Sequence, residues 1–280
     1  MNGAVDKLKL FLRRPSGVLG IAILVAVTAM ALTAGHFFPD GPTRMVARPL
    51  LWPGQQAGLL LGTDRMGSDI LAGIMYGARA SLLVGLSAAA VSIVVGTLVG
   101  AVSGYYRGWA DDVLMRITDA VQTIPSFLAA VVIVGVVGAS LTSVIISISI
   151  VSWPMIARLV RAEFLRLRNF DFVHACRIIG MSDARIILTQ ILPNCLSSIV
   201  VASSVLVATA IIVEAGLSFL GLGDPNVVSW GSMIGSGRTV LRAGWYITVI
   251  PAAFVVVTVL SINLIGDALN DALNPRLRER

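Results

Sequence analysis

The chain has 280 residues, of which 56% are hydrophobic and only 13% charged, and its mean hydropathy is +0.89. Soluble domains carry roughly 25% charged residues, so this composition excludes an ordinary soluble protein and indicates an integral membrane protein. The net charge of +6 suits cytoplasmic loops that face anionic lipid, whereas nucleic acid is not an expected partner, because no platform of aromatic and basic residues is visible.

The N-terminal part predicts a membrane anchor. A basic segment over residues 1–16 precedes an apolar run over residues 17–34, which approaches the roughly 20 residues that cross a bilayer as a helix. A cleaved signal peptide is the alternative. The run is longer than the apolar region of a typical signal peptide and no small-residue cleavage site follows it. We therefore favour a retained first transmembrane helix behind a cytoplasmic N-terminal segment.

Residues 35–79 are polar and interrupted by Pro and Gly, so they cannot cross a bilayer without exposing unsatisfied backbone groups. We expect an external segment here, then a five-helix core over residues 80–266 and a cytoplasmic tail over residues 267–280. The sequence predicts an all-α polytopic membrane protein with six transmembrane helices. The spans expected in the core run from about Ala80 to Ser103, Ile124 to Val137, Leu141 to Ile156, Leu196 to Val213 and Trp245 to Ile265.

The basic residues determine the expected orientation. With both termini in the cytoplasm, 15 of the 21 Lys and Arg residues lie inside and 6 lie outside, as the positive-inside rule requires. The loop over residues 157–195, between the fourth and fifth spans, is then cytoplasmic.

Small residues recur along the second expected span. They let helix backbones approach closely, as packing between membrane helices requires, but the same face would also suit a translocation path with room for a bulky solute. The sequence leaves both interpretations open. These residues are Gly85, Ser87, Ala88, Ala89, Ala90, Ser92, Gly96 and Gly100.

Two acidic residues lie close to expected span ends, and an ionisable group within a membrane is by default a functional hypothesis. Glu214 follows the fifth span, where we expect it at the outer interface, pairing with a partner or capping a backbone turn. Asp267 closes the sixth span on the inside, where a helix-end or loop contact is expected. Neither predicts a proton relay, which needs several buried ionisable groups.

The sequence lacks the motifs of an enzyme. Its histidines are His36 and His174, and it contains no HExxH, no GxSxG and no phosphate-cradling GxxxxGK[ST]. The cysteines, Cys176 and Cys195, offer neither a disulfide framework nor a metal-ligand spacing. We expect no catalytic activity and no cofactor or metal bound by this chain, so another subunit would supply energy for any pumping.

The cytoplasmic loop contains a distinctive polar stretch from His174 to Asp183 that runs on to Pro193. An alanine-sized face and Gly180, which permits a sharp turn, suit a small helical knob that fits a groove on another protein. Pro193 is expected to end the following helix. An ordinary cytoplasmic loop is the alternative.

This stretch resembles the cytoplasmic EAA loop of ABC importer permeases, in which E-A-A, three residues, a glycine and a later I-x-L-P-type ending form the coupling helix against the ATPase. Other blocks resemble the peptide and nickel permeases of the DppC/OppC type, in that family's order over nearly the whole chain. These blocks are Leu61–Asp69 with Tyr76–Leu82, Gly216–Gly223 with Ser229–Gly231, and Asn263–Asp267 with Asp271–Arg276.

The resemblance implies a type I ABC importer permease fold in the plasma (inner) membrane of a bacterium. It implies a homologous permease, two ATPase subunits or domains that bind ATP and Mg, an external solute-binding protein and membrane lipid as partners. The ATPase-coupling residues would be His174, Ala175, Cys176, Arg177, Gly180, Met181, Ser182 and Asp183, and the external or gate candidates Asp64, Asp69, Glu214 and Trp230.

Two positions depart from the family's pattern. His174 stands at the family's glutamate and Cys176 at its second alanine. An imidazole cannot replace a fixed carboxylate opposite a basic ATPase residue, so the docking contact at His174 differs from the family's, while Gly180 and the tip that follows it still match. The external stretch from about Pro49 to Met75 would contact the binding protein or the outer gate; a surface helix at the interface is the alternative.

The expected function is the import of dipeptides or oligopeptides, with nickel, haem or another small solute as alternatives within the family. Two other classes of function compete. A secondary transporter should display charged or broken helices at mid-membrane, and the absence of such charges argues against it. A membrane scaffold would recruit soluble proteins through the same loop.

Overall fold

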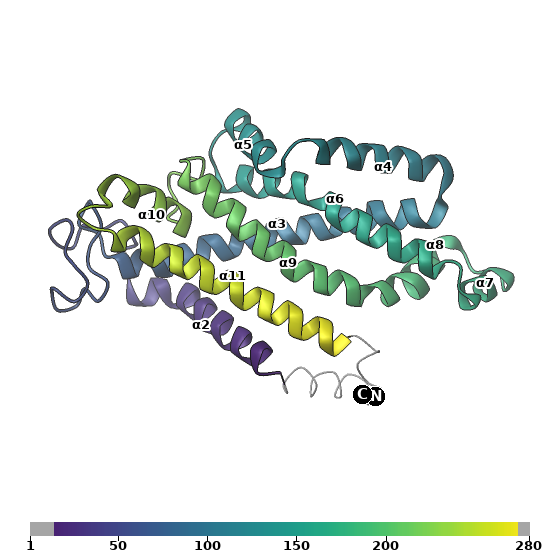
Figure 1. The fold of residues 1–280 in the computed structure, drawn as a ribbon, viewed down its shortest axis with the longest axis horizontal. Coiled ribbons are helices and arrows are strands. Elements are labelled where there is room, and N and C mark those ends of the chain that lie inside the picture. Colours follow the sequence, from purple (N-terminus) through teal and green to yellow (C-terminus); the bar gives the residue numbers. More distant parts are fainter. Residues whose placement is uncertain (1–13, 274–280) are drawn as a thin grey trace.

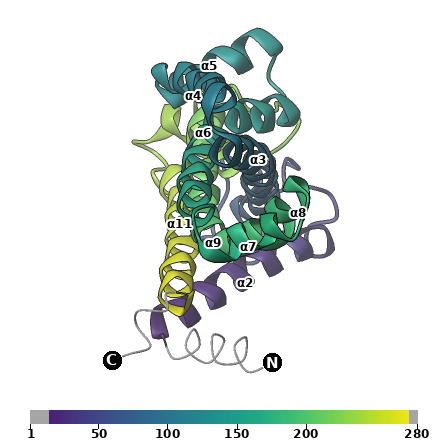
Figure 2. The same cartoon turned by 90° about the vertical axis from the view of Figure 1, so that its right-hand side faces the viewer.

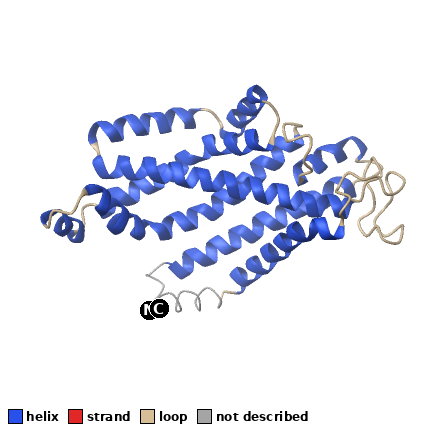
Figure 3. Cartoon of the chain, turned by 180° about the vertical axis from the view of Figure 1, so that it is seen from behind, coloured by secondary structure: helices blue, strands red, loops and turns tan. Residues whose placement is uncertain are grey.

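A computed structural model of the chain describes residues 14–273, which form a bundle of helices (Figures 1 and 3). Within that range the only β pairings are two isolated bridges in the segment between the first two long helices. The long helices are α2 (Pro15–Phe37), α3 (Ile70–Tyr106), α6 (Leu141–Leu167), α9 (Leu192–Phe219) and α11 (Tyr246–Leu273).

Shorter helices connect these five. They are α4 (Gly108–Thr123), α5 (Ser126–Val137), α7 (Asp171–Ile178), α8 (Asp183–Ile186) and α10 (Trp230–Gly237), with a π-helical turn over Ile187–Ile191 and a 3-10 turn over Arg238–Val240. Five helices are long and apolar enough to span a membrane, the fourth of them being α9 together with α8 and the π turn. The number rises to six if the bent pair α4 and α5 counts as one span. The prediction of an all-α, multi-pass membrane protein is confirmed.

The third expected span, Ile124 to Val137, is wrong as a single straight crossing. Helix α5 has only 12 residues, about 18 Å at 1.5 Å per residue, which is shorter than the ~30 Å hydrocarbon core. It is bent by 84° from α4. The break falls at Ile124 and Pro125 because a residue before proline is driven to extended backbone, and Ile124 has φ −89° and ψ 132°.

The segment between α2 and α3 is the loop Phe38 to Asp69, and α3 begins about ten residues before the predicted end of the external segment at residue 79. The first turns of α3 therefore belong to that predicted segment. Asp69 fixes the start of α3, because its carboxylate Oδ1 accepts a hydrogen bond from the backbone N–H of Leu71 at 2.8 Å, as an N-cap does. The loop is built of turns rather than of the surface helix considered for residues 49–75.

Other helices are longer than their expected spans, because helical periodicity continues past the apolar stretch. The first span, expected over residues 17–34, is α2; α6 continues to Leu167 and α9 to Phe219, so the described non-helical part of loop 157–195 is short. Helix α11 continues to Leu273, which places Asp267 on an exposed helix face instead of at a helix end. Residues 1–13 of the expected N-terminal segment and residues 274–280 of the expected tail lie outside the described residues.

The small residues of α3 pack the bundle. Gly96, Gly100 and Gly104 face α6 at intervals of four residues, where a Cβ at each would lie 2.4–2.8 Å from a backbone oxygen of α6. Six of the eight small residues noted in the sequence are buried. The packing interpretation of this face is therefore confirmed for most of it, and α3 and α6 approach each other closely at the three glycines.

The loop at α7 and the described ends of the chain lie toward the same end of the bundle. In Figure 1, α7 and α8 protrude on the right, toward which the first residues of α2 and the last of α11 also point, while the loop Phe38 to Asp69 and α10 lie on the left. Arg14 and Asp271 pair at 3.0 Å between those two described ends. This arrangement agrees with the expected orientation, in which both termini and the loop share the cytoplasmic side.

Candidate functional site

Helix α7 is held against the end of the bundle by one face. Val173 is fully buried and Cys176 partly buried, and both pack into a cluster that includes Phe164 of α6 and Ile186 of α8. These positions are three residues apart, so they share a helix face. Figure 2, which looks at this end, shows α7 and α8 in the foreground.

Gly180 ends α7 in a Schellman motif. The backbone N–H of Gly180 donates to the carbonyl of Arg177 at 3.0 Å, and that of Met181 donates to the carbonyl of Cys176 at 3.0 Å, which is the pair of bonds that defines this motif. Gly180 has φ +78°, a left-handed conformation that favours glycine. Cys176 and Met181 pack on the same cluster, which supplies the motif's apolar contact.

Tyr105, at the C-terminal end of α3, ties the loop to the transmembrane bundle. Its hydroxyl donates to the Asp183 carboxylate Oδ1 at 2.5 Å, and its ring lies 5.2 Å from the Arg177 guanidinium carbon. Arg168 Nη1 donates to the backbone carbonyl of Tyr105 at 2.5 Å. Burial, with Arg107 and Arg177 nearby, lowers the pKa of the Arg168 guanidinium from its usual range. Three residues of the loop, Asp183, Arg177 and Arg168, therefore contact Tyr105 and anchor the loop on α3.

The opposite face of α7 is exposed and apolar at its tip. Ile178 is 86% and Ile179 75% exposed, although both are large hydrophobic side chains. His174 and Ala175 are exposed one turn earlier and share this face. A protruding apolar knob outside the bilayer is typical of a protein interface. The structure thus brings His174 and Ala175 outward, turns Cys176 and Met181 inward, and uses Arg177 and Asp183 as anchors on Tyr105.

The external candidates Asp64 and Asp69 both hold local backbone. The Asp64 carboxylate Oδ1 accepts from the N–H groups of Met66 and Ser68 at 2.8 and 2.9 Å, while Asp69 caps α3. Burial raises the pKa of the Asp69 carboxyl, although its hydrogen bonds from Leu71 and Ala72 oppose the shift. Both carboxylates therefore stabilise the backbone of the loop Phe38 to Asp69 and the start of α3.

Glu214 and Trp230 are buried, so neither is available to an external protein. Glu214 is 2% exposed and lies within α9, five residues before the end of that helix. Its carboxylate accepts hydrogen bonds from Ser81 of α3 at 2.9 Å and from Ser218 at 2.7 Å. Trp230 donates from Nε1 to the carbonyl of Ile74 at 3.0 Å. Both residues therefore join α3 to the α9–α10 region.

A cavity of about 360 Å³ opens at the break between α4 and α5. Its lining combines apolar side chains with polar ones from three parts of the chain, including Gln122, Ser126, Ser152 and Thr209. Two ion pairs hold α4 against α6. Arg161 binds Asp111 in the first turn of α4 through two nitrogens at 2.6 and 2.7 Å, and Arg158 binds Asp119 in its last turns at 2.6 Å. No group of His, Cys, Asp and Glu able to hold a metal ion occurs among residues 14–273.

Comparison with known sequences decides the family. The model of the family described as "Binding-protein-dependent transport system inner membrane component" matches residues 92–279. The chain belongs to this family of ABC transporter permeases. The members of this family are permease subunits of inner-membrane transporters, and the family is not one of catalytic enzymes.

Three curated relatives match this permease over nearly its full length. The di/tripeptide transport system permease protein DppC of Pseudomonas aeruginosa is 37% identical over 92% of this chain and 88% of that protein. The glutathione transport system permease protein GsiD of Pectobacterium atrosepticum is 35% identical, covering 96% and 89%. The oligopeptide transport system permease protein OppC of Bacillus subtilis is 34% identical, covering 98% and 90%. The predicted resemblance to DppC/OppC-type permeases is confirmed.

Solved structures share the fold. An inward-facing structure of the MetNI methionine ABC transporter matches with a TM-score of 0.60 and 20% identity, covering 71% of this chain and 94% of that one. An amino acid ABC transporter crystallised with histidines matches with a TM-score of 0.54 and 16% identity, covering 69% and 90%. The permease fold expected from the sequence is confirmed.

Three residues that hold the loop in place, namely Tyr105, Arg168 and Val173, were not identified from the sequence. Tyr105 lies 78 positions before Asp183, so only the folded chain brings the two residues together. Arg168 and Val173 lie just before the matched motif. The spacing of Val173 and Cys176, three residues apart on one helix face, would have pointed to Val173, but nothing in the sequence pointed to Tyr105.

Proposed function

We propose that this chain is one of two homologous permease subunits in an ATP-driven bacterial importer of dipeptides or oligopeptides. ATPase subunits on the cytoplasmic side would supply the energy, and an external solute-binding protein would deliver the solute. The support for peptides is the naming of relatives such as DppC and OppC, with which the chain shares 34–37% identity over more than nine-tenths of its length.

The observation that carries the coupling role is the exposed apolar tip of a rigidly anchored helix. Ile178 and Ile179 protrude while Val173 is fully buried beneath them. A groove on an ATPase that covers the tip would remove this apolar surface from water. Because Tyr105 holds the loop on α3, movement of the ATPase would be passed to α3 and, through the seam of glycines, to α6. Nucleotide must favour one of the two arrangements of the transporter for this to drive transport.

The solute would pass along the cavity at the α4–α5 break, in a pathway completed by the second permease. Gln122, Ser126, Ser152 and Thr209 offer amide and hydroxyl groups there, which suit the N–H and C=O groups of a peptide backbone. Apolar neighbours such as Met155 adapt to varied side chains. No charged side chain is among the cavity's lining residues, so one pathway would accept peptides of different charge.

Reconstitution tests this function. The chain, its companion permease, the ATPases and the binding protein are placed in proteoliposomes, and uptake of a radiolabelled dipeptide is measured with and without ATP. We expect uptake that requires ATP and disappears when the ATPases carry an inactivating substitution. Competition with nickel chelates and haem identifies a different solute of the same family.

The two rival classes give different results in the same preparation. A secondary transporter would take up solute with this chain alone under an ion gradient. A scaffold would retain soluble partners without any uptake. Either result would refute the importer.

A further inference from the structure

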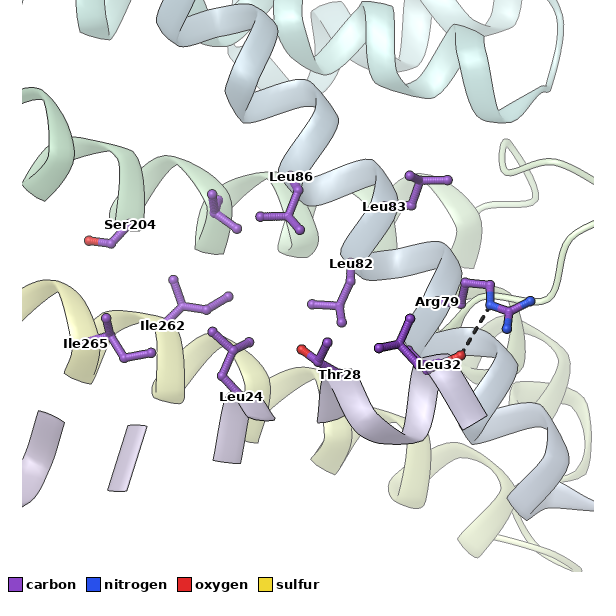
Figure 4. A pocket seen from close by; sticks show the side chains of 12 residues that line it. Leu24, Thr28, Leu32, Arg79, Leu82, Leu83, Leu86, Ser204, Ile262 and Ile265 are labelled. Atoms are coloured by element: carbon purple, nitrogen blue, oxygen red, sulfur yellow. Dashed lines mark hydrogen bonds between the residues drawn. The ribbon is translucent and has the colours of Figure 1, made fainter. Parts of the chain in front are cut away.

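An apolar groove with one charged residue opens on the surface of the bundle. It encloses about 690 Å³ between α2, α3, α9 and α11 (Figure 4), a size typical of ligand sites. Thr28, Ser204 and Arg79 are the polar residues in a lining otherwise made of Leu, Ile, Val and Ala. In Figure 4, Arg79 and Leu32 lie at one end, and Ser204 and Ile265 at the other.

Arg79 keeps part of its guanidinium free. Its Nε donates to the backbone carbonyl of Ala31 at 3.2 Å, the dashed line in Figure 4, and its guanidinium carbon lies 5.6 Å from the centre of the Tyr76 ring. None of the ion pairs found between described residues includes Arg79. The terminal N–H groups are therefore available to an anion, and a guanidinium binds phosphate oxygens in a bidentate manner.

The depth of Arg79 matches that of lipid phosphate. Helix α3 has 37 residues, about 55 Å at 1.5 Å per residue, so it extends well beyond a ~30 Å hydrocarbon core. Arg79 is nine residues from its external end, about 14 Å. Ala31, its partner, lies six residues before the external end of α2. The charged end of the groove is thus close to the outer boundary of the hydrocarbon, and the apolar remainder extends inward from it.

The groove faces away from the proposed pathway. Helices α4 and α5 lie on one side of the bundle and α2 on the other in both Figure 1 and Figure 2, so a second permease at the α4–α5 cavity would leave the groove to lipid. A spanning helix of another protein also brings an anionic side chain into the membrane only at high cost. A phospholipid carries its phosphate at this depth as part of its ordinary structure.

We propose that this groove binds one anionic phospholipid of the outer leaflet, with an acyl chain along the apolar lining and the phosphate on Arg79. The site is separate from the coupling loop and from the α4–α5 cavity. Its occupant would fill the space between α2 and the helices of the core.

Native mass spectrometry of the purified full-length chain in mild detergent tests the site, with phosphatidylglycerol and phosphatidylcholine of matched acyl chains as probes. Wild-type protein should retain phosphatidylglycerol about tenfold better. Arg79→Gln should reduce this ratio to about one, whereas Arg242→Gln, which removes an exposed external arginine outside the groove, should leave it unchanged.

A second pair of variants tests the groove without altering its charge. Thr28→Phe fills the groove and should reduce retention of both lipids, whereas Val25→Phe, on the exposed surface of the same helix and outside the lining, should not. Unaltered retention in Thr28→Phe, or an unaltered ratio in Arg79→Gln, would overturn the proposal. Displacement of the lipid by excess inorganic phosphate would also overturn it. In the assembled transporter, Leu83→Cys should cross-link to a photoactivatable lipid, and cross-linking to the second permease instead would likewise overturn the proposal.

Discussion

The α3–α6 seam and the loop at α7 both depend on glycine, for opposite reasons. At Gly100 a Cβ would lie 2.4 Å from the carbonyl oxygen of Ala157, so the seam has no space for a side chain. At Gly180 nothing lies within 4 Å of an added Cβ, but the backbone has φ +78°. The seam needs glycine for close approach and the loop needs it for a turn. Substitutions at the seam should therefore affect the fold, and those in the loop should affect coupling.

The largest effect is expected for Gly100→Ala. Alanine usually stabilises a helix by about 1 kcal/mol relative to glycine, but here the methyl group must push α6 away, which costs about 1–3 kcal/mol. Thermal unfolding in detergent should show a lower midpoint. Gly135→Ala is the matched control, since its helix position has open space, and it should be neutral or stabilising. Equal midpoints for the two variants would contradict a tight seam.

Gly180→Val should leave membrane insertion and the unfolding midpoint nearly intact while weakening association with the ATPases by about tenfold. A left-handed backbone costs an L-residue roughly 1–2 kcal/mol, and a β-branched residue adds to that strain. Co-purification of ATPases and peptide uptake measure the effect. Gly180→Asn should retain both, because asparagine tolerates this conformation. Wild-type assembly and uptake in Gly180→Val would remove the turn from the coupling mechanism.

Tyr105→Phe should reduce ATP-driven uptake a few-fold with little change in the amount of folded protein. The variant removes the hydroxyl that donates to Asp183. Because the Asp183 side chain is exposed and water can replace the lost donor, the net loss is about 0.5–1.5 kcal/mol. Tyr106→Phe is the control, since that side chain is exposed and makes no side-chain hydrogen bond among the described residues. If the two variants transport peptide equally well, the Tyr105 anchor does not transmit movement.

The smallest effect is expected for His174→Glu. This side chain is exposed on the outer face of α7, and the substitution restores the residue that the family resemblance places there. Assembly with the ATPases and uptake should match the wild type within about twofold, since an exposed charge contact contributes less than about 1 kcal/mol. Loss of assembly would indicate that the partner's groove has adapted to imidazole.

The sequence by itself determined the features that depend on local composition. Long apolar runs must cross the bilayer as helices, because only internal hydrogen bonds satisfy the backbone there, and the motif around Gly180 carries its own turn. Even so, apolarity alone placed helix ends poorly: α9 continues past Glu214 to Phe219, because Ser81 and Ser218 satisfy the Glu214 carboxylate.

Only the tertiary structure decided which distant residues meet. It assigned the small residues of α3 mainly to packing, broke the third span at Pro125, and placed Tyr105 against Asp183, 78 positions away. It also created the groove at Arg79 from four helices. Such contacts depend on how helices pack across the bundle, and no periodicity along a single segment records that geometry.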